Sequence, residues 1–230
     1  LMNQTLRTGQ TAENARQYVA KRQMSDETVS NFKLGYHPEN WNWFLEKAKG
    51  KFTPAQLVSA GLIRERDNGP GYFDNLVGRL VFPIFDERGR PVAFGGRVLP
   101  GGNIESDAKY WNSLESAIFQ KRRMLFAFNM ARDTIRESKT AIIVEGYMDC
   151  IACHQAGVKN AVATLGTAMT EEHVRFLRRF AEKVVLVYDS DAAGQQAAER
   201  SISRFLAQDL DLRILNVPSG KDPADYLEAH

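Results

Sequence analysis

The chain has 230 residues, of which 43% are hydrophobic, so it is long enough to bury a core in one large domain or two small ones. No apolar run approaches the roughly 20 residues that a membrane-spanning helix needs, and the first residues lack the basic, apolar and small-residue succession of a signal peptide. Two cysteines are too few for a disulfide framework. We therefore expect a soluble, cytoplasmic protein with no membrane partner.

The net charge of +2 conceals two halves of opposite sign. Residues 1–139 carry 21 Lys and Arg against 15 Asp and Glu, a net +6, whereas residues 140–230 carry 9 against 13, a net −4. A basic half is typical of a surface that binds a polyanion, and an acidic half of one that binds cations. Two ordinary solvated surfaces explain the charges equally well. We predict two domains, residues 1–139 and 140–230.

The front half has the pattern of a mixed α/β subdomain. Residues 25–32 favour a short helix, and residues 53–61 favour another, with Thr as its cap, Pro at its first position and Gly at its end. The segment DNGPGY, residues 67–72, is a turn-rich loop. Residues 79–86 and 91–99 are typical strands, joined by the turn ERGR.

The back half alternates apolar strands with helical segments. Four runs rich in β-branched residues, each ended by Gly, Asp or Pro, have the pattern of buried parallel strands: TAIIVEG, VKNAVATLG, EKVVLVYD and LRILNVP. Helices are predicted over 148–156, after a cap at Thr170, and over 191–206. Short connections between strands and helices predict βαβ units. The expected fold class is α/β, with a mainly parallel sheet flanked by helices, and α+β for the whole chain.

Acidic side chains follow two of these strands. Glu145 comes after one, and Asp189 and Asp191 come after another, within VYDSDAAG. Functional groups gather outside the carboxyl ends of parallel strands, so we expect the three carboxylates to face one crevice. Crowded carboxylates repel unless a cation neutralises them, and hard oxygen ligands suit Mg²⁺ or Mn²⁺. The alternative is that an aspartate only caps the next helix, but the second acidic motif, EGYMD, favours a metal site.

Two other motifs are set aside. CIACH, residues 150–154, spells the C-x-x-C-H of haem attachment and contains the C-x-x-C of redox and zinc sites. Haem attachment requires export and zinc requires two more ligands nearby. We predict instead a helix in which Cys150 and Cys153 pack as small apolar residues. SGKDP lacks the glycine that a P-loop carries five residues before its GK.

The order and spacing of several blocks indicate a family. VEGYMD, ATLGTAMT, VYDSDAAGQQAAERS and GKDPADYL resemble the toprim domain of bacterial DnaG-type primases. RLVFPIFDERGRPVAFGGRVLP and KYWNSLESAIFQKRRMLFAFNMA resemble the segment that these primases place ahead of toprim. The resemblance runs from about Thr11 to Leu227. Its FGGR, KYxNS, EGYMD and DxD blocks are highly specific in combination, although each alone is weak.

The resemblance implies roles for individual residues. Glu145 matches the toprim glutamate, a metal ligand or acid/base group, and Asp189 and Asp191 match the metal-binding pair. These three are the expected catalytic residues. Asp149 and Asp222 match further acidic positions near the metal, and we expect both as additional metal ligands. The polar cluster that the family uses for nucleotide and template binding matches Arg22, Arg97, Lys109, Tyr110, Asn112 and Lys121.

The sequence departs from the family pattern at three positions. Ser190 replaces the usual glycine between the paired aspartates, and Leu114 replaces the usual proline of the KYxNS block. Ala224 stands where many members carry a second aspartate after KDP. Whether Asp225, one position on, takes over that role is left open.

Full-length members of this family also carry an N-terminal zinc domain and a C-terminal helicase-binding domain. No CxxC or CHC pattern precedes Thr11, and the chain stops just past KDPADYL. We therefore expect a monomeric fragment of the catalytic core. Zinc would belong to the missing first domain, and the replicative helicase would bind the missing last one.

The resemblance implies DNA-directed RNA polymerisation, the synthesis of short RNA primers on single-stranded DNA from NTPs. Two metals about 3.5 to 4 Å apart can serve the attacking and the leaving oxygen at once. Arg97, Lys109 and Lys121 would bind triphosphate or template backbone. Three alternatives stay open: another toprim enzyme, such as a type IA topoisomerase or an OLD-type nuclease; a phage or plasmid relative; and a non-catalytic nucleic-acid-binding module.

Overall fold

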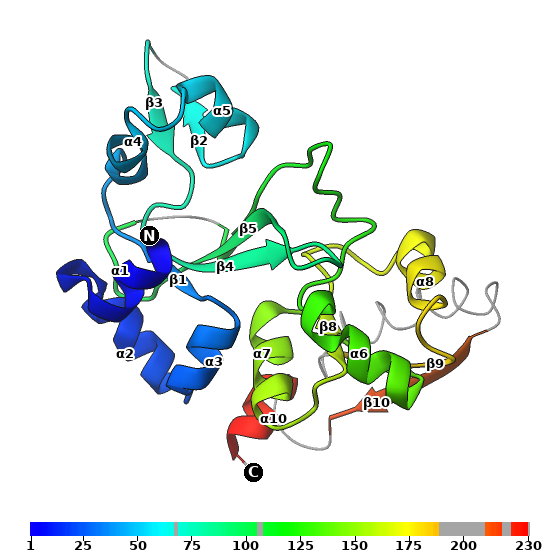
Figure 1. Ribbon diagram of the computed structural model, residues 1–230. Coiled ribbons are helices and arrows are strands. Elements are labelled where there is room, and N and C mark those ends of the chain that lie inside the picture. The colour runs from blue at the N-terminus through cyan, green and yellow to red at the C-terminus, as the bar shows by residue number, and fades with distance from the viewer. Residues whose placement is uncertain (67–68, 105–107, 189–209, 218–221, 230) are drawn as a thin grey trace. The chain divides into compact units, whose positions relative to one another are not determined.

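The computed structural model describes residues 1–66, 69–104, 108–188, 210–217 and 222–229, and Figure 1 labels most of their helices and strands. Two compact units are present: Leu1–Ile84 with Val92–Ser116, and Phe85–Pro91 with Ala117–His230. Residues 117–139 therefore pack with the second unit, while the domain boundary expected at 139/140 stays a prediction. Among the described helices, none has the length and apolar character that crossing a lipid bilayer requires.

The first unit is mixed α/β, built on a four-stranded sheet of order β1-β4-β5-β6. A separate antiparallel pair joins β2 to β3. Its helices are α1 (Met2–Thr8), η1 (Gln10–Ala12), α2 (Glu13–Lys21), α3 (Asp26–Asn31), α4 (Trp43–Ala48) and α5 (Pro54–Ser59). Its strands are β1 (Gly35–His37), β2 (Ile63–Glu65), β3 (Tyr72–Asp74), β4 (Arg79–Phe85), β5 (Pro91–Val98) and β6 (Tyr110–Asn112).

Local sequence signals set the start of two helices in this unit. The hydroxyl of Ser25 accepts a hydrogen bond from the backbone N–H of Thr28 and so caps α3. Thr53 and Gln56 form a reciprocal capping box at the start of α5, with Pro54 at the first helical position. Both helices agree with the sequence prediction, because these side chains satisfy N–H groups that a helix leaves unpaired at its start.

The predicted strands around ERGR are also confirmed, as β4 and β5. Asp86 organises the turn between them, since one of its carboxylate oxygens accepts from the backbone N–H groups of Arg88 and Arg90, both at 2.9 Å. Gly89 has a φ of 77°, a left-handed conformation that glycine adopts without steric cost.

The second unit contains a parallel sheet of order β10-β9-β7-β8. Its strands are β7 (Thr140–Val144), β8 (Ala161–Ala163), β9 (Lys183–Tyr188) and β10 (Asp211–Asn216). Its helices are α6 (Phe128–Ser138), α7 (Tyr147–Gln155), α8 (Glu171–Leu177) and α10 (Pro223–Ala229). The four predicted strands and their parallel arrangement are confirmed, and so is the fold class. The helix predicted over 191–206 lies outside the described residues.

The core of the second unit lies between one face of this sheet and two helices. Ala141 and Ile143 of β7, Ala131 and Ile135 of α6, and Val174 of α8 belong to one buried cluster. Alternate residues of a strand point to the same face, which explains why positions 141 and 143 share this core. Burial of each larger side chain in this cluster, such as Ile143, contributes roughly 1.5 to 3 kcal/mol, so the sheet is a stable base for the loops at its ends.

Candidate functional site

The carboxyl ends of two neighbouring strands define the candidate site. Strands β7 and β9 pair in parallel, with Ile143 opposite Leu186, so their carboxyl ends meet at the same edge of the sheet. Glu145 directly follows β7, and in the sequence Asp189 directly follows β9. The sheet thus places Glu145 next to the strand that leads into the predicted aspartate pair. Asp189 and Asp191 themselves lie outside the described residues.

Glu145 stands in a loop that is tied to its neighbour. The residue is half-buried, and its backbone carbonyl accepts a hydrogen bond from the hydroxyl of Thr164 at 3.3 Å. Thr164 follows β8 and is itself buried. The loops after β7 and β8 are therefore joined, which restricts the position of the Glu145 backbone.

Asp149 is buried in the first turn of α7, with 7% of its surface exposed. One carboxylate oxygen, Oδ2, accepts from the backbone N–H of Gly146 at 3.1 Å, and the other, Oδ1, accepts from the backbone N–H of Ala224 at 3.3 Å. Its carboxylate is therefore directed at backbone groups at the starts of α7 and α10.

Asp222 precedes α10 and caps it. Its Oδ1 accepts from the backbone N–H of Asp225 at 2.7 Å, and Pro223 follows it at the first helical position. The KDP motif therefore has a local structural role, because Asp followed by Pro starts a helix efficiently. Asp225 lies one position beyond the place of the family's second aspartate, within the first turn of α10.

The donor chemistry of this edge fits a hard divalent cation, since the available side-chain atoms are carboxylate oxygens. Within residues 1–66, 69–104, 108–188, 210–217 and 222–229, no group of three acidic, His or Cys side chains is close enough to hold a metal. Of the five expected metal ligands, the described part contains Glu145, Asp149 and Asp222. The other two are the aspartates that follow β9.

The predicted nucleotide-binding residues of the first unit centre on Arg97. Arg97 of β5 lies directly opposite Tyr110 of β6. Its guanidinium lies 5.0 Å from the ring centroid of Tyr18 and 5.2 Å from that of Tyr110, and it donates to the Tyr110 hydroxyl at 2.7 Å. Arg97 is only 7% exposed. Two aromatic rings and one hydrogen bond thus fix its orientation.

Tyr18 was not among the predicted site residues. It belongs to α2, far from Arg97 in the sequence, and no local pattern links the two. Among the described residues, neither Arg97 Nε nor the Tyr18 hydroxyl has a hydrogen-bond partner, although both atoms are buried. Buried polar groups are rarely left unpaired. These two atoms are therefore candidates for contact with a bound molecule.

The other predicted residues of this unit lie near the same elements. Arg22 directly follows α2, and its backbone N–H bonds to the carbonyl of Tyr18. Asn112 of β6 is half-buried and pairs with Gly95 of β5. Lys109 is exposed and directly precedes β6. The first unit therefore gathers these predicted residues at β5, β6 and the end of α2.

Lys121 lies in the second unit, in a loop of residues 121–124 that is held by its carbonyl groups. Buried His173 bonds through Nε2 to the carbonyls of Lys121 and Met124, at 2.9 and 3.1 Å. The Thr170 hydroxyl donates to the carbonyl of Arg122 at 2.6 Å. We call residues 121–124 the anchored loop. The sequence indicated Thr170 as a helix cap, which is confirmed, but gave no signal for this second bond.

His173 also completes the cap of α8. Its backbone N–H donates to the Thr170 hydroxyl, and its ring Nδ1 accepts from the Thr170 backbone N–H at 3.2 Å. Because Nδ1 faces a donor, the ring proton belongs on Nε2, which points at carbonyl oxygens. Burial lowers the pKa of His173, which favours this neutral form.

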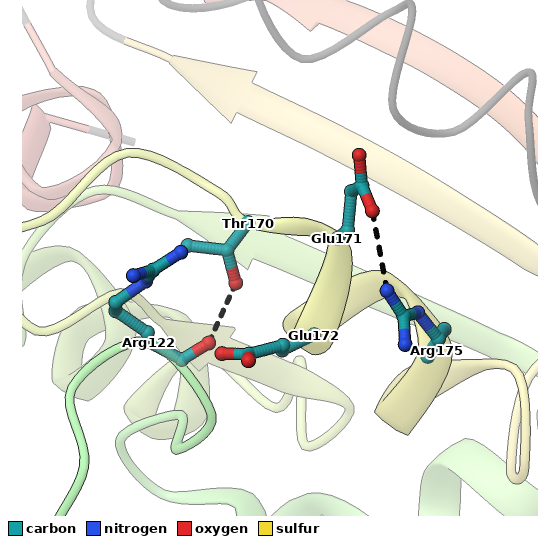
Figure 2. A pocket seen from close by; sticks show the side chains of 5 residues that line it. All are labelled: Arg122, Thr170, Glu171, Glu172 and Arg175. Carbon is teal, nitrogen blue, oxygen red and sulfur yellow. Dashed lines mark hydrogen bonds and ion pairs between the residues drawn. The ribbon is translucent and has the colours of Figure 1, made fainter.

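A polar pocket of about 320 Å³ adjoins the anchored loop. Figure 2 shows its lining, with the Thr170–Arg122 hydrogen bond on one side and the Glu171–Arg175 ion pair on the other. Glu172 also lines it. The two arginines and two glutamates largely balance each other's charge, so the pocket does not favour either sign of ligand.

The cysteines agree with the packing interpretation of CIACH. Cys150 and Cys153 are buried on α7, and the thiol of Cys150 donates to the carbonyl of Ala161 in β8 at 3.6 Å. Burial raises the pKa of Cys150, and it raises the pKa of Cys153 to about 12. His154 bonds through Nε2 to the same Ala161 carbonyl. The prediction that this segment is a helix in which both cysteines are packed inside is confirmed.

Two family models match the chain. Residues 1–132 match the model described as DNA primase catalytic core, N-terminal domain, and residues 142–227 match the one described as Toprim-like. The chain belongs to the DnaG-type DNA primase family. The resemblance inferred from its motifs is therefore confirmed.

Relatives in the primase family extend this result. A DNA primase of Synechococcus elongatus is 43% identical over 91% of this chain, which spans 31% of that relative's length. A DNA primase domain from Pseudomonas aeruginosa superposes with a TM-score of 0.92 at 36% identity, covering 100% of this chain and 71% of the other. A DnaG primase catalytic domain bound to ssDNA gives a TM-score of 0.88 at 35% identity, with 100% and 71% covered. The chain thus spans about a third of the full-length relative.

Proposed function

We propose that this chain carries the nucleotidyl-transfer site of a DNA primase, a DNA-directed RNA polymerase that makes short RNA primers on single-stranded DNA during replication. The observation that carries the proposal is the parallel pairing of β7 with β9, which sets Glu145 beside the strand that leads into Asp189 and Asp191. Carboxylates gathered at one edge of a parallel sheet are suited to hold divalent ions that contact phosphate.

In this proposal Glu145, Asp189 and Asp191 are the catalytic residues and hold Mg²⁺ or Mn²⁺, with Asp222 close by. The bound ion supplies charge neutralisation at the attacking and leaving oxygens of phosphoryl transfer. The chain's own contribution is position: Thr164 restrains the loop that bears Glu145, and α10 begins at Asp222. Accurate placement of charged groups is the main task of a protein in this chemistry.

We assign nucleotide and template binding to basic and polar residues. Arg97, held between Tyr18 and Tyr110, is preorganised for contact with phosphate, and its buried Nε is available as a donor. Exposed Lys109 contributes a point charge. We assign the same binding role to Arg22, Asn112 and Lys121. The solved structure of a DnaG primase catalytic domain bound to ssDNA supports a single-stranded DNA template.

Other partners rest on the family resemblance alone. NTPs as substrates follow from the proposed reaction. The replicative helicase as a partner, zinc in a separate domain, the monomeric state and the cytoplasmic location all stay expectations.

The test is template-directed incorporation of labelled NTPs on single-stranded DNA with Mg²⁺. We expect Glu145→Gln and Asp189→Asn to reduce incorporation by at least about 100-fold, because each removes a charge that holds the ion. Matched controls lie at the opposite, amino edge of the same sheet. Glu182 precedes β9 and Asp211 begins β10, both exposed, so Glu182→Gln and Asp211→Asn should leave incorporation unchanged.

Two results would contradict the proposal. Incorporation that survives Glu145→Gln and Asp189→Asn would remove the catalytic assignment. Single-strand binding without any incorporation by the native chain would instead favour the non-catalytic binding module.

A further inference from the structure

One buried carboxylate connects two segments that carry proposed site residues. Asp149 accepts from the backbone N–H of Gly146 through Oδ2 and from that of Ala224 through Oδ1. Gly146 is the residue after Glu145, and Ala224 lies two residues after Asp222. A single side chain is therefore bonded to the loop that bears Glu145 and to the start of α10.

Both N–H groups need a hydrogen-bond acceptor from outside the backbone of their own helix. Both lie at helix starts, where backbone donors have no intrahelical acceptor and where the helix dipole favours a negative charge. Ala224 is 2% exposed, so water does not readily replace the bond. Asp222 serves a different donor of the same helix, the N–H of Asp225. Helix α10 also packs along α7, so the carboxylate lies within a packed contact.

Gly146 shows that this contact constrains the sequence. A Cβ added at Gly146 would lie 2.9 Å from Asp149 Oδ2, which is closer than ordinary van der Waals contact. The φ of Gly146 is −124°, a conformation open to any residue. Close approach of the Asp149 carboxylate, and not backbone conformation, is therefore what favours glycine at this position.

We propose that Asp149 is a positioning residue, a clamp that holds the start of α10, and with it Asp222, against the loop of Glu145. This differs from the expectation that Asp149 is itself a metal ligand, because its carboxylate charge is directed at the starts of two helices. The catalytic meaning of the clamp rests on the proposed function. The clamp itself can be tested without metal, nucleotide or template.

The first test is amide hydrogen exchange on the whole chain in the absence of metal. Asp149→Ala and Gly146→Ala should both accelerate exchange at Ala224 and in the first turn of α10 by about tenfold, the loss expected for one such hydrogen bond. Asp133→Asn, an exposed aspartate in α6, is the control and should change nothing. Unchanged protection of α10 in both clamp variants would overturn the proposal. If Asp149→Ala does not fold, Gly146→Ala and Asp149→Asn carry the test.

The second test is Mn²⁺ binding, followed by electron paramagnetic resonance. A positioning role predicts that Asp149→Asn and Gly146→Ala bind as many ions as the native chain, with affinity lowered about 10- to 100-fold, as for residues that orient metal ligands. A ligand role predicts that Asp149→Asn loses an ion while Gly146→Ala, which keeps the carboxylate, binds normally. That second pattern would overturn the proposal. If the native chain binds no Mn²⁺, the proposed function fails, and hydrogen exchange alone decides the clamp.

Discussion

Replacement of His173 should reveal how strongly the anchored loop is held to α8. His173→Ala removes the donor to the carbonyls of Lys121 and Met124 and the acceptor of the Thr170 N–H. The hydrogen bond from Nε2 contributes about 1 kcal/mol, and the bond to Nδ1 at the helix cap contributes about 1 kcal/mol more. The cavity left by the ring adds a further cost. We therefore expect a loss of about 2 to 4 kcal/mol in the free energy of unfolding. Urea denaturation followed by circular dichroism measures it.

His173 should also make the free energy of unfolding depend on pH. Burial lowers the pKa of His173 from its ordinary value near 6.5, with bonds to backbone carbonyls acting in the opposite direction, so the unfolded chain binds a proton more readily than the folded one. The contribution of neutral His173 to the free energy of unfolding is therefore fully present above the pKa of the unfolded chain. It is lost as the pH falls through 6.5 towards the lower pKa of the folded chain. His154, also buried with a lowered pKa, contributes with the same sign.

His173→Gln separates titration from hydrogen bonding, because an amide can donate and accept but does not gain a proton in this range. We expect its urea midpoint to fall less than that of the native chain between pH 7.5 and pH 5.5, with His154 contributing to the slope that remains. An equal pH slope in both proteins, or a loss below about 0.5 kcal/mol in His173→Ala, would refute the reasoning.

Three further predictions concern separate parts of the chain. The thiols of Cys150 and Cys153 should not react with an aromatic disulfide reagent at pH 7.5 until urea unfolds the chain, because burial raises both pKa values; rapid labelling of the folded chain would contradict this. Gly96→Ala should cost about 1 to 3 kcal/mol by thermal unfolding, because its Cβ would lie 2.8 Å from the side chain of Leu76, and an unchanged midpoint would argue against that close packing. The affinity for single-stranded DNA should fall steeply as the salt concentration rises. Lys109→Ala should reduce the slope of log affinity against log salt concentration by about 0.7. An affinity of the native chain that does not change with salt would contradict the electrostatic assignment.

Much of the fold followed from local patterns. The strands of the second unit could be predicted because β-branched runs in a buried parallel sheet are nearly continuously apolar and end at Gly, Asp or Pro. The starts at Ser25, Thr53 and Thr170 could be predicted because each capping hydroxyl bonds within its own turn. The helix predicted from Met148 begins one residue earlier, at Tyr147, because Gly146 and the Asp149 carboxylate form its cap.

The rest of the site depends on contacts between distant residues. Nothing in the local sequence around Tyr18 indicates that its ring lies against Arg97. The bonds of His173 to the anchored loop likewise join separate segments, so no spacing rule finds them. Asp222 is a different case. Asp followed by Pro is a helix-start pattern, so the cap of α10 could have been predicted, but Asp222 was interpreted only as a metal-site residue.

The family resemblance assigned roles to individual residues, which hydrophobic periodicity does not do. It selected Lys121 from a run of three consecutive basic residues, which charge alone does not distinguish from one another. In the structure Lys121 belongs to the second unit, whereas Arg97 and the residues around it belong to the first. The charge counts had placed all of these residues in one basic half of the chain. Such counts follow sequence position and carry no information about which segments pack together.

The central claim is that a divalent ion joins the ends of β7 and β9, and a calorimetric Mn²⁺ titration of the folded chain tests it most directly. We expect saturable binding by the native chain and by Glu182→Gln, at the amino edge of the sheet, and a loss of at least about tenfold in affinity for Glu145→Gln and Asp189→Asn. Equal binding by all four proteins would contradict the account.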